Sequence, residues 1–197
     1  MHTTVETTNQ YIANTYARTP LALTHGKGSL LYDEAGKEYI DFGSGIAVNV
    51  FGVADPEWEK AVCEQAGKLQ HCSNYYYTQP QARLAELLCE KSGLKAVFFC
   101  NSGAEANECM IKASRKYGEV TGRSAIVTLK DSFHGRTIAT LAATGQDVFH
   151  QHFGPFPAGF AYATPNDLSS VRALCEEENA CAVMLEVVQG EGGVRAL

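Results

Sequence analysis

Basic charge is scarce in this sequence. Lysine and arginine together number 16, against 22 aspartates and glutamates, which gives a formal net charge of −6. A surface that binds nucleic acid needs a clustered basic face, because it must neutralise phosphates. We therefore expect no nucleic-acid partner and attribute the mild negative charge to solubility.

Long apolar runs are missing as well. No segment approaches the ~18 consecutive apolar residues that a membrane-spanning helix needs. The first ten residues are polar and rich in threonine, and they contain no basic patch followed by an apolar segment, as a signal peptide would. We expect a cytoplasmic protein with no membrane partner.

The cysteines show neither a disulfide pattern nor a metal-ligand pattern. They number seven, an odd count, and contain no C-x-x-C pair. Most lie within apolar runs, so we expect buried free thiols, because cysteine packs as a small hydrophobe. His150 and His152 alternate near Cys175 and Cys181 in sequence only. We therefore expect no metal site.

Two common phosphate-binding fingerprints are also absent. The sequence has neither G-x-x-x-x-G-K-[ST] nor G-x-G-x-x-G. The first absence argues against a P-loop ATPase. The second absence argues against an NAD-binding module, which stays an alternative without its usual motif.

What the sequence does contain begins with a β-hairpin. Short runs at Ser29–Tyr32 and Lys37–Phe42 flank turn residues 33–36. The pattern changes at Asp55-Pro56, where a capping residue and a proline begin a helix. The first fifty residues therefore look rich in β-structure, and a different pattern follows them.

From residue 55 onward, helices and strands alternate. Continuous apolar runs predict buried strands at residues 96–100, 125–129 and 181–188, and helical spacing predicts helices at about 56–69, 80–91, 104–117, 137–143 and 167–177. This alternation is typical of an α/β domain around a mainly parallel sheet. Ligands of such domains bind beyond the carboxyl ends of the strands.

The segment Asn101–Asn107 (NSGAEAN) follows the first predicted strand and opens a helix. Free backbone N–H groups and the helix dipole favour a phosphate there, and Gly103 and Ala104 allow close approach. Ser102 can add a hydroxyl donor. The same pattern also fits a serine that only caps its helix, so both interpretations remain open for this segment alone.

The segment Ser132–Thr137 (SFHGRT) follows the second predicted strand at the same edge of the sheet. Phe133 can stack on a flat heterocycle, and Arg136 can hold a carboxylate in a bidentate pair. A core phenylalanine and a surface ion pair are the plainer interpretations of these two residues taken singly. A third loop, Gln189–Gly193 (QGEGG), follows the last predicted strand.

Taken together and in order, these three segments resemble the class III (subgroup II) aminotransferases. Asp41–Asn49 (DFGSGIAVN) and His71–Tyr76 (HCSNYY) are similar to the acetylornithine and succinylornithine aminotransferase branch. The resemblance covers nearly the whole chain after about Tyr11. It implies the fold type I architecture, a large domain with a mainly parallel sheet and a small domain built from both chain ends. Residues 1–50 would then belong to the small domain and residues 51–197 to the large one.

The resemblance also implies roles for particular residues. Ser102, Gly103 and Ala104 would cradle the phosphate of pyridoxal 5'-phosphate, and Phe133 would stack on its ring. Arg136 would bind a substrate carboxylate. Two further substrate-binding residues are implied, namely Glu191 near the substrate and Gly45 at the border of the pocket.

The family's catalytic residues are not found in the chain. None of its lysines has the context of the Schiff-base lysine, which would lie beyond Leu197 together with the aspartate that pairs with the pyridine nitrogen. The chain is therefore expected to be an N-terminal fragment with no catalytic residue of its own, and the fragment alone is expected to be inactive.

The implied reaction moves the δ-amino group of N-acetylornithine to 2-oxoglutarate in arginine biosynthesis, in a homodimer. The alternatives within the family are succinylornithine, acetyl-lysine, ornithine and 4-aminobutyrate as amino donors. A non-catalytic remnant that keeps the fold without the chemistry is the alternative of another class.

Overall fold

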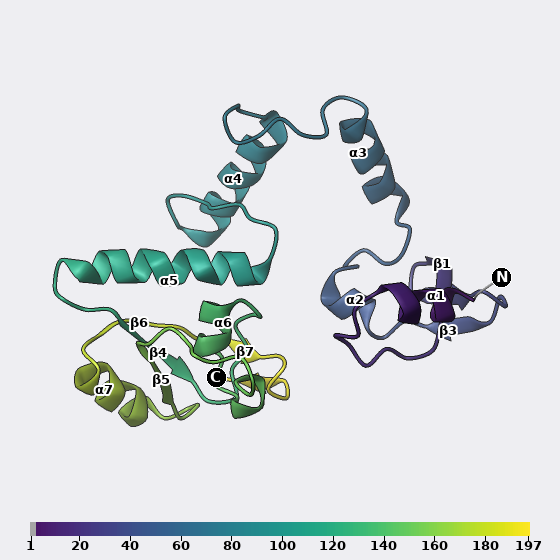
Figure 1. Ribbon diagram of the computed structural model, residues 1–197. Helices are drawn as coiled ribbons and strands as arrows, with labels where there is room; N and C mark the ends of the chain where they lie inside the picture. The colour runs from purple at the N-terminus through teal and green to yellow at the C-terminus, as the bar shows by residue number, and fades with distance from the viewer. Residues whose placement is uncertain (1–2) are drawn as a thin grey trace. The chain divides into compact units, whose positions relative to one another are not determined.

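The computed structural model describes residues 3–197, which divide into two compact units, a first that ends at Gln79 and a second that spans Pro80–Leu197. Each unit is described by itself (Figure 1). Among the described residues, no helix combines the length and apolarity needed to cross a membrane. The division into a small and a large domain at residue 50 remains a prediction.

The first unit contains a three-stranded antiparallel sheet. Its strands are β1 (Leu23–Lys27), β2 (Leu30–Asp33) and β3 (Glu38–Ile40), and its helices are α1 (Thr4–Tyr11), α2 (Ser44–Ala47) and α3 (Pro56–Ala66). Strands β2 and β3 form the predicted hairpin, and Asp33 Oδ1 stabilises its turn by accepting from the N–H groups of Ala35 and Lys37, both at 2.9 Å. Asp55 caps α3 as predicted, since its side chain accepts from the N–H of Trp58. The sequence pattern missed β1, α1 and α2.

The second unit is an α/β domain, as predicted. Its elements are α4 (Gln79–Ser92), α5 (Gly103–Glu119), β4 (Ala125–Leu129), α6 (Ile138–Ala143), the 3-10 helix η1 (Asp147–Phe149), β5 (Phe160–Ala163), α7 (Leu168–Glu177), β6 (Ala180–Val183), β7 (Val188–Gln189) and β8 (Arg195–Ala196). The main sheet is parallel, with the order β5-β4-β6. All five residues of the central strand β4 are buried.

Alternate residues of β4 pack against opposite layers. Val127 and Leu129 join a cluster with Val171 and Leu174 of α7. Ile126 instead packs with Ile111 of α5 and Ala143 of α6. The sheet therefore lies between α7 on one face and α5 with α6 on the other (Figure 1), and the burial of aliphatic side chains on both faces stabilises the layered unit.

Two predictions about apolar segments are wrong. Residues 96–100 form no strand, and Phe98 is 61% exposed. No described strand pairs with this segment, and an extended run without a partner satisfies no ladder of hydrogen bonds. The third predicted strand is also shorter than expected, since β6 ends at Val183 and β7 begins only at Val188.

The cysteines are free, as predicted, but they are not buried. Cys63 and Cys100 are exposed, and the other five are half-buried. Among the described residues, no group of three or more potential ligands is placed to hold a metal ion.

Candidate functional site

The site is built where the N-terminus of α5 meets the loop that follows β4. Gly135 packs so closely on the helix that a Cβ built on it would lie 2.9 Å from the Cβ of Ala104. Asn107 Nδ2 donates to the carbonyl oxygen of His134 at 2.7 Å, and the Thr137 hydroxyl donates to the Glu108 carboxylate. Three contacts from the first two turns of the helix therefore fix the loop against it.

The turn before α5 leaves its first N–H groups open. Ser102 caps the helix, because its hydroxyl oxygen accepts from the N–H of Glu105 at 3.2 Å. The Glu105 carboxylate in turn accepts from the N–H of Asn101 at 2.5 Å. Gly103 and Ala104 are the first two residues of the helix, so their N–H groups have no acceptor within it.

The space beside Gly103 is open. A Cβ built on Gly103 would meet nothing within 4 Å. Helix α5 is 17 residues long, and the positive end of its dipole lies at this turn. The turn therefore fits a phosphate, with two open N–H groups beside a hydroxyl that already serves as the cap.

Phe133 is half-buried at the other side of the site. Its N–H donates to Glu186 Oε1 at 2.9 Å, and its ring meets the Phe149 ring edge-on, with centroids 6.0 Å apart. The Arg136 guanidinium lies 5.1 Å from the centroid of Phe133 and 4.2 Å from that of Phe149. Within residues 3–197, Arg136 has no carboxylate partner within 4.0 Å.

Glu186 connects two of the loops. Its second oxygen accepts from the N–H of Gly190 at 3.4 Å, while the first holds the N–H of Phe133. The same carboxylate also acts on His134, which is buried and bonds to the Thr128 hydroxyl at 2.9 Å. Burial lowers the pKa of His134, and the negative charge of Glu186 opposes that shift without reversing it.

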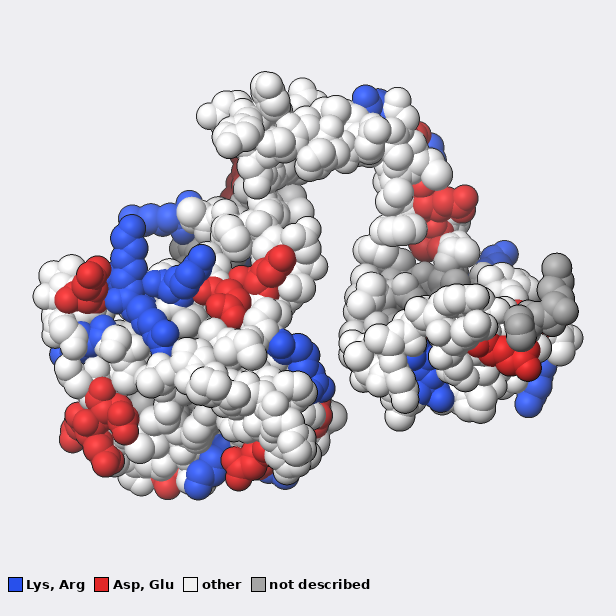
Figure 2. Space-filling model, viewed as in Figure 1, with Lys and Arg blue, Asp and Glu red and all other residues white. Residues whose placement is uncertain are grey.

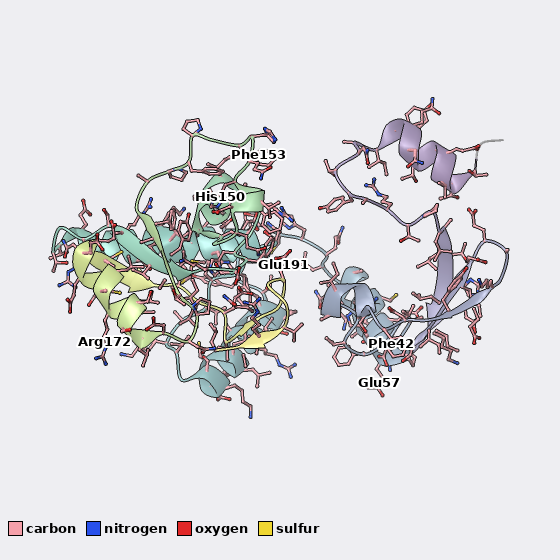
Figure 3. All side chains as sticks on the ribbon, turned by 90° about the horizontal axis from the view of Figure 1, so that it is seen from below. Phe42, Glu57, His150, Phe153, Arg172 and Glu191 are labelled. Atoms are coloured by element: carbon pink, nitrogen blue, oxygen red, sulfur yellow. The ribbon has the colours of Figure 1, made fainter. Side chains whose placement is uncertain are left out.

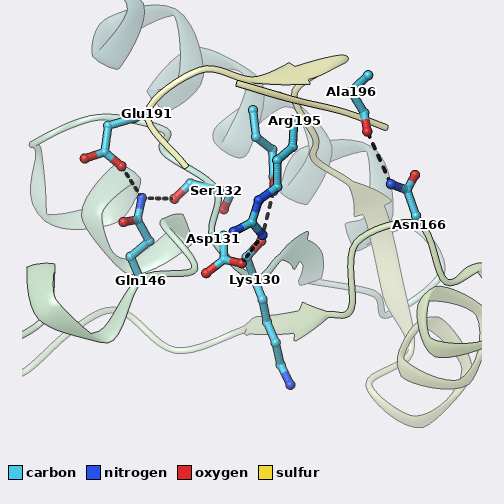
Figure 4. Close-up of polar contacts among 9 residues, drawn as sticks. Lys130, Asp131, Ser132, Gln146, Asn166, Glu191, Arg195 and Ala196 are labelled. Atoms are coloured by element: carbon cyan, nitrogen blue, oxygen red, sulfur yellow. Dashed lines mark hydrogen bonds and ion pairs between the residues drawn. The ribbon is translucent and has the colours of Figure 1, made fainter. Parts of the chain in front are cut away.

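Glu191 is joined to the loop after β4 through Gln146 (Figure 4). The Gln146 side-chain amide donates both to the Glu191 carboxylate and to the carbonyl oxygen of Ser132, the latter at 3.1 Å. Nearby, Arg195 pairs with Asp131 at 2.9 Å. These bonds hold the segment after β7 against the ends of the parallel strands.

The surface around the site carries charges of both signs. Figure 2 shows both acidic and basic side chains on the visible face of Pro80–Leu197, where one group of basic side chains lies beside separate acidic groups. The binding of an anion therefore depends on local groups such as the α5 N-terminus and Arg136 rather than on the overall charge.

Most of the site residues predicted from the sequence lie in the second unit. Ser102, Gly103 and Ala104 form the turn, and contacts through Gly135, Asn107 and Gln146 join that turn to the loops that carry Phe133, Arg136 and Glu191. Gly45 lies in the first unit, in a left-handed conformation with φ of 60°, and its place in a substrate pocket remains a prediction.

Three residues with roles in this arrangement were missed. They are Gln146, Phe149 and Glu186, all of which act through contacts to residues far away in sequence. Only Glu186 could have been found from the sequence, because a charged residue inside an apolar run needs a partner.

Comparison with known proteins identifies the family. The profile of the class-III aminotransferases matches residues 11–197. The chain belongs to this family. The predicted resemblance is therefore confirmed, and an independent NAD-binding module is excluded as the identity of the chain.

Relatives of known name support the same branch. The chain is 56% identical over 190 residues to the acetylornithine aminotransferase of Haemophilus ducreyi, a match that covers 95% of this chain and 48% of that protein. It is 46% identical to a succinylornithine transaminase of Salmonella paratyphi A, over 97% of this chain and 47% of that one. The chain thus spans about half the length of the curated relatives it matches.

Solved structures of aminotransferases share the fold. The ornithine aminotransferase of Toxoplasma gondii matches with a TM-score of 0.90 at 29% identity, covering 96% of this chain and 46% of that one. The N-acetylornithine aminotransferase of Stenotrophomonas maltophilia matches with a TM-score of 0.76 at 37% identity, over the same shares. The predicted α/β fold of a pyridoxal-phosphate-dependent aminotransferase is confirmed.

Proposed function

We propose that this chain supplies the phosphate-binding, ring-stacking and carboxylate-binding residues of an acetylornithine aminotransferase. The enzyme would move the δ-amino group of N-acetylornithine to 2-oxoglutarate, in arginine biosynthesis. The observation that carries the proposal is the contact of Gly135 with Ala104, which joins the open turn of α5 to the loop of Phe133 and Arg136. The 56% identity to an acetylornithine aminotransferase favours this amino donor.

Pyridoxal 5'-phosphate is the cofactor that these residues fit. A structure of the Toxoplasma ornithine aminotransferase contains it at partial occupancy in the active site. In this chain, the N–H groups of Gly103 and Ala104 would donate to the phosphate, with Ser102 beside them, and Phe133 would cover one face of the ring. When bound, the cofactor supplies the electron sink on which transamination depends. The protein residues anchor it and fix its orientation.

The substrate residues act by charge and position. Arg136 would bind a carboxylate through its planar fork of N–H donors, which matches that group in geometry. Glu191 would border the substrate, held in place by Gln146. Gly45 is also proposed to border the substrate, as the family resemblance implies, and its lack of a side chain would leave room there.

The lysine that holds the cofactor is proposed to lie outside these residues, together with the acidic partner of the ring nitrogen. The active protein is proposed to be a homodimer. Succinylornithine, acetyl-lysine, ornithine and 4-aminobutyrate remain alternative amino donors, and the 46% identity to a succinylornithine transaminase favours the first of them. A non-catalytic protein that keeps the fold is the remaining alternative.

The test is turnover by the product of the complete reading frame that encodes this chain. We expect 2-oxoglutarate-dependent consumption of N-acetylornithine with a higher kcat/KM than for the other four donors. Preference for another donor would replace the proposed substrate, and no turnover of any donor would favour the non-catalytic alternative.

A second measurement concerns the 197-residue chain alone. We expect no turnover from it, and no stoichiometric pyridoxyl adduct by mass spectrometry after borohydride reduction with pyridoxal phosphate. A single adduct at one lysine, together with turnover, would show that the cofactor lysine lies within the chain.

A further inference from the structure

A fourth segment, absent from the sequence motifs, reaches the site through the 3-10 helix η1. Phe149 ends this helix and presents its ring to the Arg136 guanidinium at 4.2 Å, nearer than the 5.1 Å to Phe133. The two rings meet at an interplanar angle of 76°. Arg136 therefore faces two aromatic surfaces that come from different segments of the chain.

The position of Phe149 is fixed from both sides. On one side, Gln146 bonds to Ser132 and to Glu191, and an isolated bridge joins Gly145 to Lys130. On the other side, a ring nitrogen of His150 lies 2.9 Å from the carbonyl oxygen of Leu141 in α6, and Figure 3 labels this histidine. The helix itself is closed by the bond from the N–H of Phe149 to the carbonyl oxygen of Gln146.

An arginine held by aromatic rings keeps its N–H donors, whereas one paired with a carboxylate uses them. A cation over an aromatic face is attracted by the ring quadrupole, and its in-plane N–H donors are not consumed by that contact. Within residues 3–197, no acidic group competes for Arg136. The donors therefore remain free for an incoming anion, while the rings limit the directions in which the side chain can point.

We propose that Phe149 is a positioning residue, whose ring holds the Arg136 guanidinium beside Phe133 with its N–H donors free for a substrate carboxylate. This inference rests on the proposed role of Arg136 in substrate binding. It adds a determinant of carboxylate affinity that lies outside the three family segments.

The experiment uses NMR of the 15N-labelled 197-residue chain, with 2-oxoglutarate as the probe. The Arg136 Nε–Hε resonance reports on the ring contact, because protons over an aromatic face shift upfield. Phe149→Leu keeps an apolar side chain but removes the aromatic face. Phe149→Tyr keeps the aromatic face. Val148→Ala is the matched control, since Val148 lies on the same turn but is 62% exposed.

We expect Phe149→Leu to move the Arg136 resonance downfield and to weaken 2-oxoglutarate binding by about threefold to thirtyfold, the range of one cation–π contact. Phe149→Tyr and Val148→Ala should retain the values of the unsubstituted chain. Unchanged resonance and affinity in Phe149→Leu would overturn the inference.

The same experiment separates this inference from the proposed function. If 2-oxoglutarate fails to perturb Arg136 in the unsubstituted chain, the carboxylate role of Arg136 fails, and the resonance position still decides whether Phe149 holds the guanidinium. Should Phe149→Leu lose the dispersed spectrum of a folded chain, Arg136→Lys gives the reciprocal measurement. It should shift the ring protons of Phe149, and a lack of any shift would contradict the contact.

Discussion

Gly135 lies directly against Ala104, and no larger residue fits between the loop after β4 and the N-terminus of α5. A Cβ on Gly135 would lie 2.6 Å from the Thr140 hydroxyl oxygen and 2.9 Å from the Cβ of Ala104. The φ of Gly135, 139°, is also one that residues with a side chain rarely adopt. The glycine thus sets the distance between the two halves of the site.

Gly135→Ala should therefore destabilise the chain and loosen the site. We expect a loss of about 1–3 kcal/mol in the free energy of unfolding, from overpacking and backbone strain. Urea unfolding measures it. The matched control is Gly103→Ala, which meets no atom within 4 Å and should change stability much less. Equal effects of the two substitutions would contradict the packing account.

Arg136→Ala should affect substrate more than cofactor. In the complete protein we expect KM for N-acetylornithine and 2-oxoglutarate to rise by about tenfold or more, since a charged, geometrically matched contact is lost. The dissociation constant of pyridoxal phosphate, measured by absorbance titration, should stay nearly unchanged. Loss of the cofactor with an unchanged KM would show that Arg136 serves the cofactor instead.

Glu186 should be needed for the geometry of both loops. Glu186→Ala leaves the half-buried N–H of Phe133 without its acceptor, at a cost of about 1–3 kcal/mol in the free energy of unfolding. Glu186→Gln retains one carbonyl acceptor and should lose less. Unfolding by urea, followed by far-UV circular dichroism, compares the two, and equal losses would show that the second carboxylate oxygen carries the link.

His134 should make stability depend on pH. Its folded pKa lies below the usual value of 6.5 because burial disfavours the charged ring. Between the two pKa values the unfolded chain binds more protons, so stability is complete above about pH 6.5 and falls as the pH drops below it. His134→Gln should flatten this part of the profile. A profile that keeps its slope in the variant would assign the dependence to another group.

The local parts of the fold could be predicted from the sequence because their causes are local. Strand β4 matches its apolar run, and helices begin at residues that cap them, such as Asp55, Ser102 and Thr137. A capping side chain contacts an N–H group only two or three residues away, so the sequence alone contains both partners. The turn of α5 could be placed for the same reason.

The remaining parts depend on distant partners. Asn107 bonds to His134 across 27 residues, and Phe133 bonds to Glu186 across 53, so no local pattern contains either contact. Strand β5 is only four residues long, which is too short for its pattern to identify a strand. Conversely, residues 96–100 have the composition of a buried strand but no described neighbour to pair with, because a strand is defined by its partner.

The central claim is that the turn at Gly103 and Ala104 binds the cofactor phosphate while Phe133 contacts its ring. Its most direct test is an NMR titration of the 15N-labelled chain with pyridoxal phosphate, with inorganic phosphate and pyridoxal as controls. Phosphate should shift the amides of Gly103 and Ala104, pyridoxal phosphate should also shift the ring protons of Phe133, and pyridoxal alone should leave the two amides unmoved. Shifts confined to other parts of the chain, or none at these amides, would contradict the account.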